Sequence, residues 1–257
     1  MDSIERLFVG LLTLLLLASR IGATGVDAGD QLYQYRVTWN GIPAARATVR
    51  LTERVPHEPP TTRMWVEMRT NRFVDLFWSL RAESWAEVDA ATLRSLHFAF
   101  ERRINGKPET TQIEADGDGL LTGRYARPWR YRLIEVNDAN ALDPIAAVLR
   151  VRHALPALGD SSTYDIFTGE ARYRIELRRY ASETVDVPAG RFTAARIEPV
   201  IWRVDQDGPD TRVRHLTLWV TDTPPHTLVR VRSEVFIGAL YADLTEWSRN
   251  DGAQPQP

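Results

Sequence analysis

The residues whose types could do chemistry are few and scattered along the chain. Residues 158–162 are Leu-Gly-Asp-Ser-Ser, and a Gly-Asp-Ser block with a distant aspartate–histidine pair is typical of one hydrolase family. Asp222 and His226 could supply that pair, but the block lies in the middle of the chain and the Asp-to-His spacing is four residues rather than three. A polar loop between a helix and a strand is the better interpretation.

The sequence supports a metal site or a pair of catalytic carboxylates no better than it supports this hydrolase site. Asp116-Gly117-Asp118-Gly119 resembles the start of a calcium loop, but Arg127 stands where such a loop needs a bidentate glutamate, so we expect a hairpin turn. The histidines show no paired spacing, and we therefore expect no metal and no cofactor; they are His57, His97, His153, His215 and His226. A glycosidase needs two carboxylates about 5 to 10 Å apart. The acids that could be assembled in that way are Asp143, Asp222, Asp243 and Glu198.

Composition excludes several classes of protein. The chain has 257 residues, with 32 Lys and Arg against 34 Asp and Glu, a formal net charge of −2 and no cysteine. No excess of positive charge is present to hold nucleic acid or an anionic membrane surface. Disulfides, thiolate metal sites and cysteine nucleophiles are impossible. We therefore expect a non-catalytic protein without a nucleic-acid partner.

The N-terminus has the pattern of an export signal. Residues 7–18 form an apolar run of about 12 residues, which fits the core of a signal peptide and is too short to span a bilayer. We expect residues 1–23 to be a signal peptide that is cleaved on export, with cleavage after Gly25 as the alternative, and 24–30 to be a linker. The mature chain would then be periplasmic, without a transmembrane segment.

From residue 31 onward, apolar and polar residues alternate with a period of two. Residues 33–39 and 172–178 show the pattern, and turn sequences such as Asn40-Gly41 and Asn105-Gly106 separate such segments. We predict about eleven to thirteen antiparallel strands in one β-rich domain over residues 31–248, followed by a disordered tail at 249–257.

One segment interrupts the strands with a helical pattern. Asp143 can cap and Pro144 can begin a helix over 144–153, while a turn at 74–78 could be helix or strand. A sheet of this many strands must close into a barrel or stack as a sandwich to bury its apolar face. We therefore predict a mainly β protein with a large curved antiparallel sheet or open barrel, or alternatively a β-sandwich. The eight tryptophans and eight tyrosines favour the curved sheet, whose concave side they could fill.

Several segments, in their order and spacing, resemble a known family of exported bacterial proteins. They are residues 73–78 with 83–85, 143–150, 187–192, 218–222 and 228–231. The chain is similar over about residues 31 to 248 to the family catalogued as domain of unknown function 3108. The resemblance implies a periplasmic, β-rich protein without an established activity. Pro224-Pro225-His226 departs from the family pattern, which more often has a second acidic residue after Asp222.

The leading functional hypothesis is binding of an apolar or amphipathic envelope molecule, such as a lipid, in the concavity of the sheet. The helix at 144–153 would either cover the open end, with Ile145, Val148 and Leu149 facing inward, or pack on a sheet edge. The alternatives are an envelope assembly scaffold that contacts other proteins through a sheet edge, and a carbohydrate-acting hydrolase. The predicted ligand-binding residues are Tyr33, Tyr35, Trp39, Leu149 and Trp219.

Overall fold

The computed structural model describes residues 30–55, 59–116, 118–204, 216–234 and 238–249. The expected signal peptide at 1–23, the linker up to residue 29 and the tail from residue 250 lie outside these residues. Asp30 and Arg249, which the sequence places in the linker and the tail, begin the first strand and end the last one.

Fourteen strands form a single sheet in which neighbouring strands are antiparallel. In chain order they are β1 (Asp30–Trp39), β2 (Ile42–Val55), β3 (Thr61–Thr70), β4 (Leu80–Asp89), β5 (Ser95–Ile104), β6 (Lys107–Ala115), β7 (Leu120–Arg127), β8 (Arg130–Asn137), β9 (Ser161–Phe167), β10 (Arg172–Val187), β11 (Gly190–Arg203), β12 (Leu216–Thr221), β13 (Leu228–Glu234) and β14 (Ala239–Arg249). The described residues thus contain more strands than the eleven to thirteen expected. The β7–β8 turn is Pro128-Trp129, in which Trp129 has a φ of 67°, a conformation usually given to glycine.

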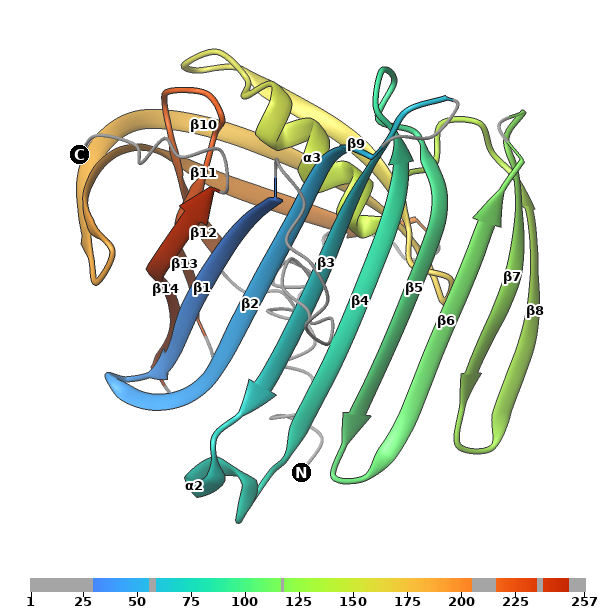
Figure 1. Cartoon of the computed structure of the whole chain (residues 1–257), viewed down its shortest axis with the longest axis horizontal. Helices are drawn as coiled ribbons and strands as arrows, with labels where there is room; N and C mark the ends of the chain where they lie inside the picture. The colour runs from blue at the N-terminus through green and yellow to red at the C-terminus, as the bar shows by residue number, and fades with distance from the viewer. Residues whose placement is uncertain (1–29, 56–58, 117, 205–215, 235–237, 250–257) are drawn as a thin grey trace.

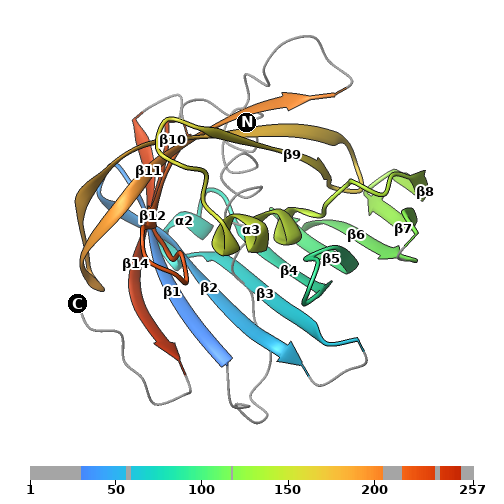
Figure 2. The same ribbon diagram turned by 90° about the horizontal axis from the view of Figure 1, so that it is seen from above.

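The strand order joins the two ends of the chain in the middle of the sheet. β1 pairs with β14, β1 to β8 follow in sequence on one side, and β14 back to β9 follow on the other. The sheet curls strongly but leaves β8 and β9 as end strands, so the molecule is an open barrel rather than a sandwich (Figures 1 and 2). The predicted curved sheet is confirmed.

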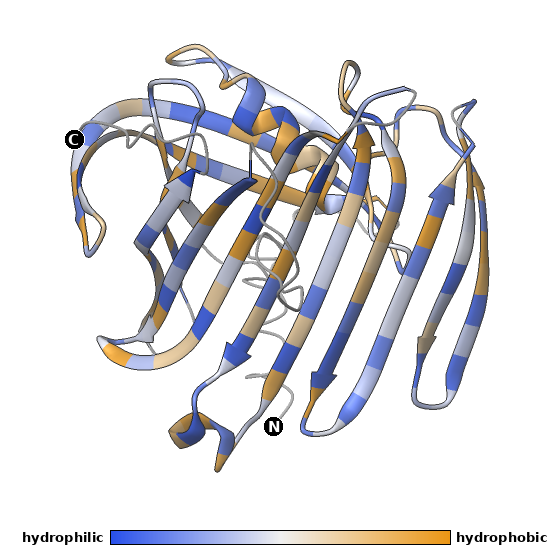
Figure 3. Ribbon diagram, in the orientation of Figure 1, coloured by the Kyte–Doolittle hydropathy of each residue, from blue (hydrophilic) through white to orange (hydrophobic). Residues whose placement is uncertain are grey.

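Alternate side chains of each strand fill the concave side of this sheet. Along β1, the side chains of Tyr33, Tyr35 and Val37 are buried, whereas Gln34 and Arg36 face outward. The same alternation is visible as bands of hydrophobic and hydrophilic colour along the strands in Figure 3. The period-two pattern therefore defines an inner apolar face and an outer polar face, as in other sheets with one wet side.

In the part of the chain that the structure describes, two helices accompany the sheet. α2 (Arg72–Asp75) is a single turn between β3 and β4, capped by the side chain of Asn71. The segment that could be helix or strand is thus partly helical. α3 (Pro144–His153) has the bounds that the sequence predicts.

Candidate ligand-binding site

Helix α3 lies inside the concavity, between the β9–β10 part of the sheet and the strands β3 to β5 (Figure 2). The side chains of Pro144, Ile145, Ala146, Ala147 and Leu149 are buried. Its last turn carries the basic residues Arg150, Arg152 and His153, which interact favourably with the negative end of the helix dipole. The helix contacts the end strand β9 as well as β4, so the choice between a cover over the open end and packing on a sheet edge stays a prediction.

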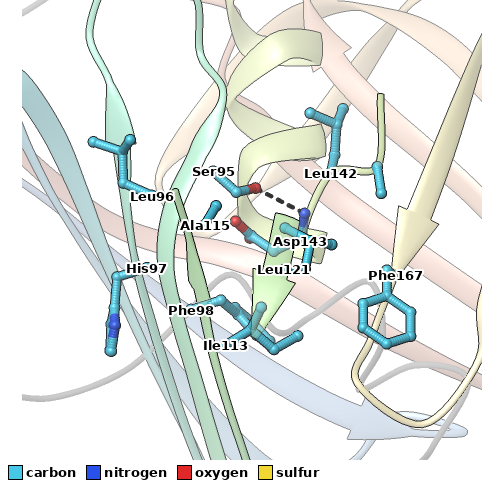
Figure 4. Close-up of a pocket in the computed structure, with 11 residues that line it drawn as sticks. Ser95, Leu96, His97, Phe98, Ile113, Ala115, Leu121, Leu142, Asp143 and Phe167 are labelled. Atoms are coloured by element: carbon cyan, nitrogen blue, oxygen red, sulfur yellow. Dashed lines mark hydrogen bonds between the residues drawn. The ribbon is translucent and has the colours of Figure 1, made fainter. Parts of the chain in front are cut away.

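The residues just before α3 attach it across the open seam of the barrel. Leu142 forms a parallel bridge with Ile166 of β9, with hydrogen bonds from the Leu142 amide to Asp165 and from the Phe167 amide to Leu142. The amide of Asp143 donates to Ser95 Oγ of β5 at 2.9 Å (Figure 4). The start of the helix is thereby tied to both parts of the sheet.

Asp143 is a buried N-cap carboxylate. Its Oδ1 accepts the amides of Ile145 (2.7 Å) and Ala146 (2.9 Å), while Oδ2 is buried and has no hydrogen-bond partner among the described residues. Burial raises the pKa of Asp143 to about 6, despite the opposing effect of the nearby Ser95 hydroxyl and of the amides that donate to Oδ1.

This carboxyl group predicts a pH-dependent stability. Because the folded-state pKa of Asp143 is above its unfolded value near 4, the folded protein retains a proton that the unfolded chain has released between about pH 4 and 6. The free energy of unfolding should therefore fall by about 2 kcal/mol as the pH rises through this window. In Asp143→Asn this fall should be absent, as measured by urea unfolding at pH 4.5 and pH 7.5. The exposed Asp118→Asn is the control, and an equal fall in all three proteins would contradict the prediction.

An apolar cavity of about 80 Å³ lies on one side of α3 and is the larger of the two cavities that border this helix on its sides. Its walls come from α3 and from the inner faces of β9, β10 and β12, with side chains such as Val151, Ile175, Leu177, Leu218 and Val220. Among the described residues of this lining, three have polar side chains, and they are Arg152, Tyr164 and His226. The cavity is suited to an aliphatic group.

A second cavity of about 50 Å³ lies on the other side of α3, against β1 to β3. Tyr33 and Tyr35 form part of its wall, together with Val49, Leu51 and Met64. The hydroxyl of Tyr35 donates to the carbonyl of Leu228 at 2.9 Å, and burial raises the pKa of Tyr35 above its usual range, so this phenol stays neutral. Side by side, the two cavities approach the roughly 150 Å³ of an engineered apolar cavity that binds benzene.

The two cavities share four lining residues, Val148, Arg152, His226 and Leu228. Val148 and Arg152 are one helical turn apart on α3, and His226 precedes β13, where its Nδ1 lies 2.9 Å from the carbonyl oxygen of Thr221. Arg152 is therefore the cationic group at the junction of two apolar spaces.

Arg152 is nearly buried and has weak counter-charge. Its side chain is 11% exposed, and the nearest carboxylate, Glu53, lies at 4.0 Å and is itself 43% exposed. One guanidinium nitrogen donates to Gln31 Oε1, and the guanidinium carbon lies 5.5 Å from the centre of the Tyr33 ring. A neutral amide and a ring face hold the cation in place without neutralising it.

The structure brings only part of the predicted ligand-binding set together. Tyr33 and Tyr35 line the smaller cavity. Leu149 is buried in the core and does not line either cavity. Trp39 is 43% exposed at the end of β1, and Trp219 lies between two inward-facing residues of β12, where its indole donates to Glu183. Trp39 and Trp219 thus also lie outside both cavities.

Sequence reasoning missed Arg152 and His226. The position of Arg152 in the last helical turn indicates only a dipole interaction, although its spacing of four from Val148 places both on one helix face. His226 lies among prolines in a segment that gives no indication of approaching α3. Contacts between such distant segments follow from the curl of the sheet.

The carboxylates considered for a hydrolase have other partners. Asp222 pairs with Arg179 at 2.8 Å, Asp243 with Arg230, and Glu198 with Arg196 at 3.5 Å. Asp143 caps α3. Within the described ranges, no group of three or more His, Cys, Asp or Glu side chains is placed to hold a metal ion.

The fold and the site together define a class: an open, antiparallel β-barrel with a helix in its concavity and apolar cavities beside that helix. The chain belongs to the family described as protein of unknown function DUF3108, whose match covers residues 34–245. No curated protein matches the chain. Among the described residues, no helix is both long and apolar enough to cross a bilayer.

One solved structure shares the fold at low sequence identity, and two others match with lower TM-scores. The chain is similar to a β-barrel-like protein of domain of unknown function DUF1849 from Brucella abortus, with a TM-score of 0.58 and 10% identity over 86% of this chain and 98% of that one. An exported protein with a YmcC-like fold from Bacteroides fragilis matches with a TM-score of 0.33 and 14% identity, over 87% and 97% of the two chains. A lipoprotein from Parabacteroides distasonis matches with a TM-score of 0.35 and 11% identity, over 86% of this chain and 96% of that one. The first of these supports the fold alone.

Proposed function

We propose that the protein binds an amphipathic envelope molecule, with its apolar part between α3 and the concave face of the sheet. The observation that supports this function is the pair of apolar cavities that meet at Val148, Arg152, His226 and Leu228. Burial of aliphatic groups there contributes about 0.8 kcal/mol per methylene before ordering costs. The cavities hold only a short aliphatic segment, so a full acyl chain would need a shift of α3.

The head group of this molecule is an anion. Among the described residues that line the two cavities, Arg152 is the only arginine, lysine or acid, so none of these residues offers it a carboxylate there. A carboxylate or phosphate at the junction of the cavities would supply the counter-charge that Glu53 supplies only weakly at 4.0 Å. Aliphatic chains with such head groups are the chemical class that matches both features.

The experiment is extraction of the purified, exported protein with organic solvent, followed by mass spectrometry of the bound lipid. Val151→Asp places a charge in the wall of the larger cavity and should lower the amount of bound lipid severalfold. Arg174→Asp changes an exposed residue of β10 and serves as the control. Absence of lipid from the wild type, together with no heat on titration with decanoate or 1-decanol, would overturn the proposed function.

The proposed place of action is the periplasm, because the apolar run at 7–18 has the length of a signal-peptide core. Mass spectrometry of the exported protein should show loss of about the first 23 to 25 residues. Recovery of the intact N-terminus in the membrane fraction would contradict this expectation.

A second candidate function, contact with another envelope protein, is favoured by the end strand β8. Tyr131 and Leu133 are exposed hydrophobic side chains on this strand, and an end strand can accept an extended segment of a partner. A photo-crosslinking amino acid at Leu133, but not at Thr122 of the neighbouring β7, should then yield one defined adduct in the cell. The same yield from both positions would argue against it.

A further inference from the structure

Five arginines form a continuous row on the outer face of the sheet. In the register of the strands Arg36 lies opposite Arg46, Arg46 opposite Arg69, Arg69 opposite Arg81, and Arg81 opposite Arg103. Directly paired residues share one face of a sheet, and like charges in such pairs repel each other. The arginine row, as we call these five residues, therefore concentrates positive charge across β1 to β5.

Acidic neighbours neutralise the arginine row only in part. Arg81 pairs with Asp75, and Arg103 pairs with Glu101 at 3.0 Å. Arg36 lies opposite Asp243 of β14, whose carboxylate pairs with Arg230. For Arg46 and Arg69, the described part of the chain offers no carboxylate within ion-pair distance. The middle of the row is thus left with uncompensated positive charge.

A parallel row of acids lies two residues away along the strands. Glu67 is opposite Glu83, and Glu83 is opposite Glu101. Burial, together with the charges of Glu101 and Glu67, raises the pKa of Glu83. The arginine row lies between these acids and the end of the barrel that carries α2, so positive charge faces that end.

Exposed hydrophobic side chains gather at the same end. Asn71 donates from its amide to Ala44 and from its side chain to Pro43, which holds the start of α2 beside the β1–β2 hairpin. Leu76 and Phe77 of the α2 segment are 76% and 78% exposed. Figure 3 shows hydrophobic segments at both places, which Figure 1 locates at α2 and at the turn between β1 and β2. The apolar tip consists of Trp39, Ile42, Phe73, Leu76 and Phe77.

We propose that this end of the barrel docks onto a membrane surface that contains anionic lipids. The apolar tip would enter the boundary between head groups and acyl chains, where tryptophan and phenylalanine are favoured, and the arginine row would face the phosphates. A flat surface with anionic head groups above an apolar layer matches a band of arginines behind exposed aromatic side chains. The site is separate from the ligand cavities, because none of these residues lines either of them.

The test is co-sedimentation of the purified protein with vesicles of phosphatidylcholine alone or with 30% phosphatidylglycerol. The wild type should bind the vesicles with phosphatidylglycerol at least about tenfold more tightly than those of phosphatidylcholine alone. Addition of 0.5 M NaCl should weaken the binding to the anionic vesicles. Arg46→Gln/Arg69→Gln should remove most of the preference for anionic vesicles. Phe73→Ser/Phe77→Ser should weaken binding to both kinds of vesicle about tenfold or more.

The matched controls are Arg124→Gln and Leu158→Ser, an exposed arginine and an exposed leucine outside this end. Both should bind as the wild type does. All four variants replace exposed or half-exposed side chains, and equal far-ultraviolet circular dichroism spectra would show that they fold. Failure of the wild type to pellet, or equal binding by every variant, would overturn the proposal. Loss of a dimer in the Phe73→Ser/Phe77→Ser variant, without vesicle binding by the wild type, would instead assign this end to a second copy.

Discussion

Replacing Arg152 with glutamine should lower the affinity for decanoate about thirtyfold or more and leave the affinity for 1-decanol within about twofold. The expectation follows from the position of the guanidinium group at the junction of two apolar cavities, where the Arg152 side chain is only 11% exposed. Removing one partner of a desolvated charge pair typically costs 2 to 5 kcal/mol of binding free energy. Isothermal titration calorimetry with both amphiphiles measures the two affinities.

Arg150→Gln is the matched control for this variant. Arg150 lies in the same last turn of α3 but donates to the carbonyl of Thr92 and lines neither cavity. Arg152→Lys should keep part of the preference for decanoate, since it keeps the charge. Equal binding of decanoate and 1-decanol by the wild type would show that the cavities bind aliphatic chains without a preferred head group.

Replacing Gly123 with alanine should destabilise the protein by about 3 kcal/mol or more. A Cβ atom at this position of β7 would lie 2.0 Å from the carbonyl oxygen of Gln112 and 3.0 Å from Cα of Ile113, both in the backbone of β6. A paired backbone cannot yield as the end of a flexible side chain can, so β6 and β7 would have to separate locally. Urea unfolding followed by circular dichroism gives the change in the free energy of unfolding.

Gly106→Ala separates the steric effect from the loss of a glycine. Gly106 has a φ of +79°, and no atom lies within 4 Å of the place that a Cβ atom would take, so its replacement carries only backbone strain of about 1 to 2 kcal/mol. We expect the larger decrease in the free energy of unfolding for Gly123→Ala, although the φ of Gly123 is not positive. A loss at Gly123 no larger than that at Gly106 would refute the steric argument.

Local patterns in the sequence determined the elements of this protein. Alternation of apolar and polar residues predicts the strands, because one face of each strand meets the core and the other meets water. Asp143 and Pro144 predict the start of α3 because a cap and a first-turn proline act within a few residues. These patterns predict a mainly β protein, whereas the choice of an open, curved sheet over a sandwich required the tertiary structure. The family resemblance was carried by particular segments, such as residues 143–150 and 187–192.

The candidate site could be predicted only in part. Tyr33 and Tyr35 were found because they point inward on β1, and inward position follows from the period of two. Trp39 shares that alternation but lies at the end of the strand, beside the exposed hairpin. Side-chain size alone could not distinguish a cavity wall from an exposed tip.

Tertiary structure decided which distant residues meet. His226 approaches Val148 and Arg152 of α3 only because the sheet curls around the helix. The arginine row depends on the register of five strands, and a shift of one residue would send these side chains to the other face. The net charge of −2 gives no indication of that row, because the net charge is a sum over all residues and does not say where the charges lie. The sequence alone thus determined what is governed by neighbours within a few residues, while the contacts on which the proposed ligand and membrane binding rest required strand register and curvature.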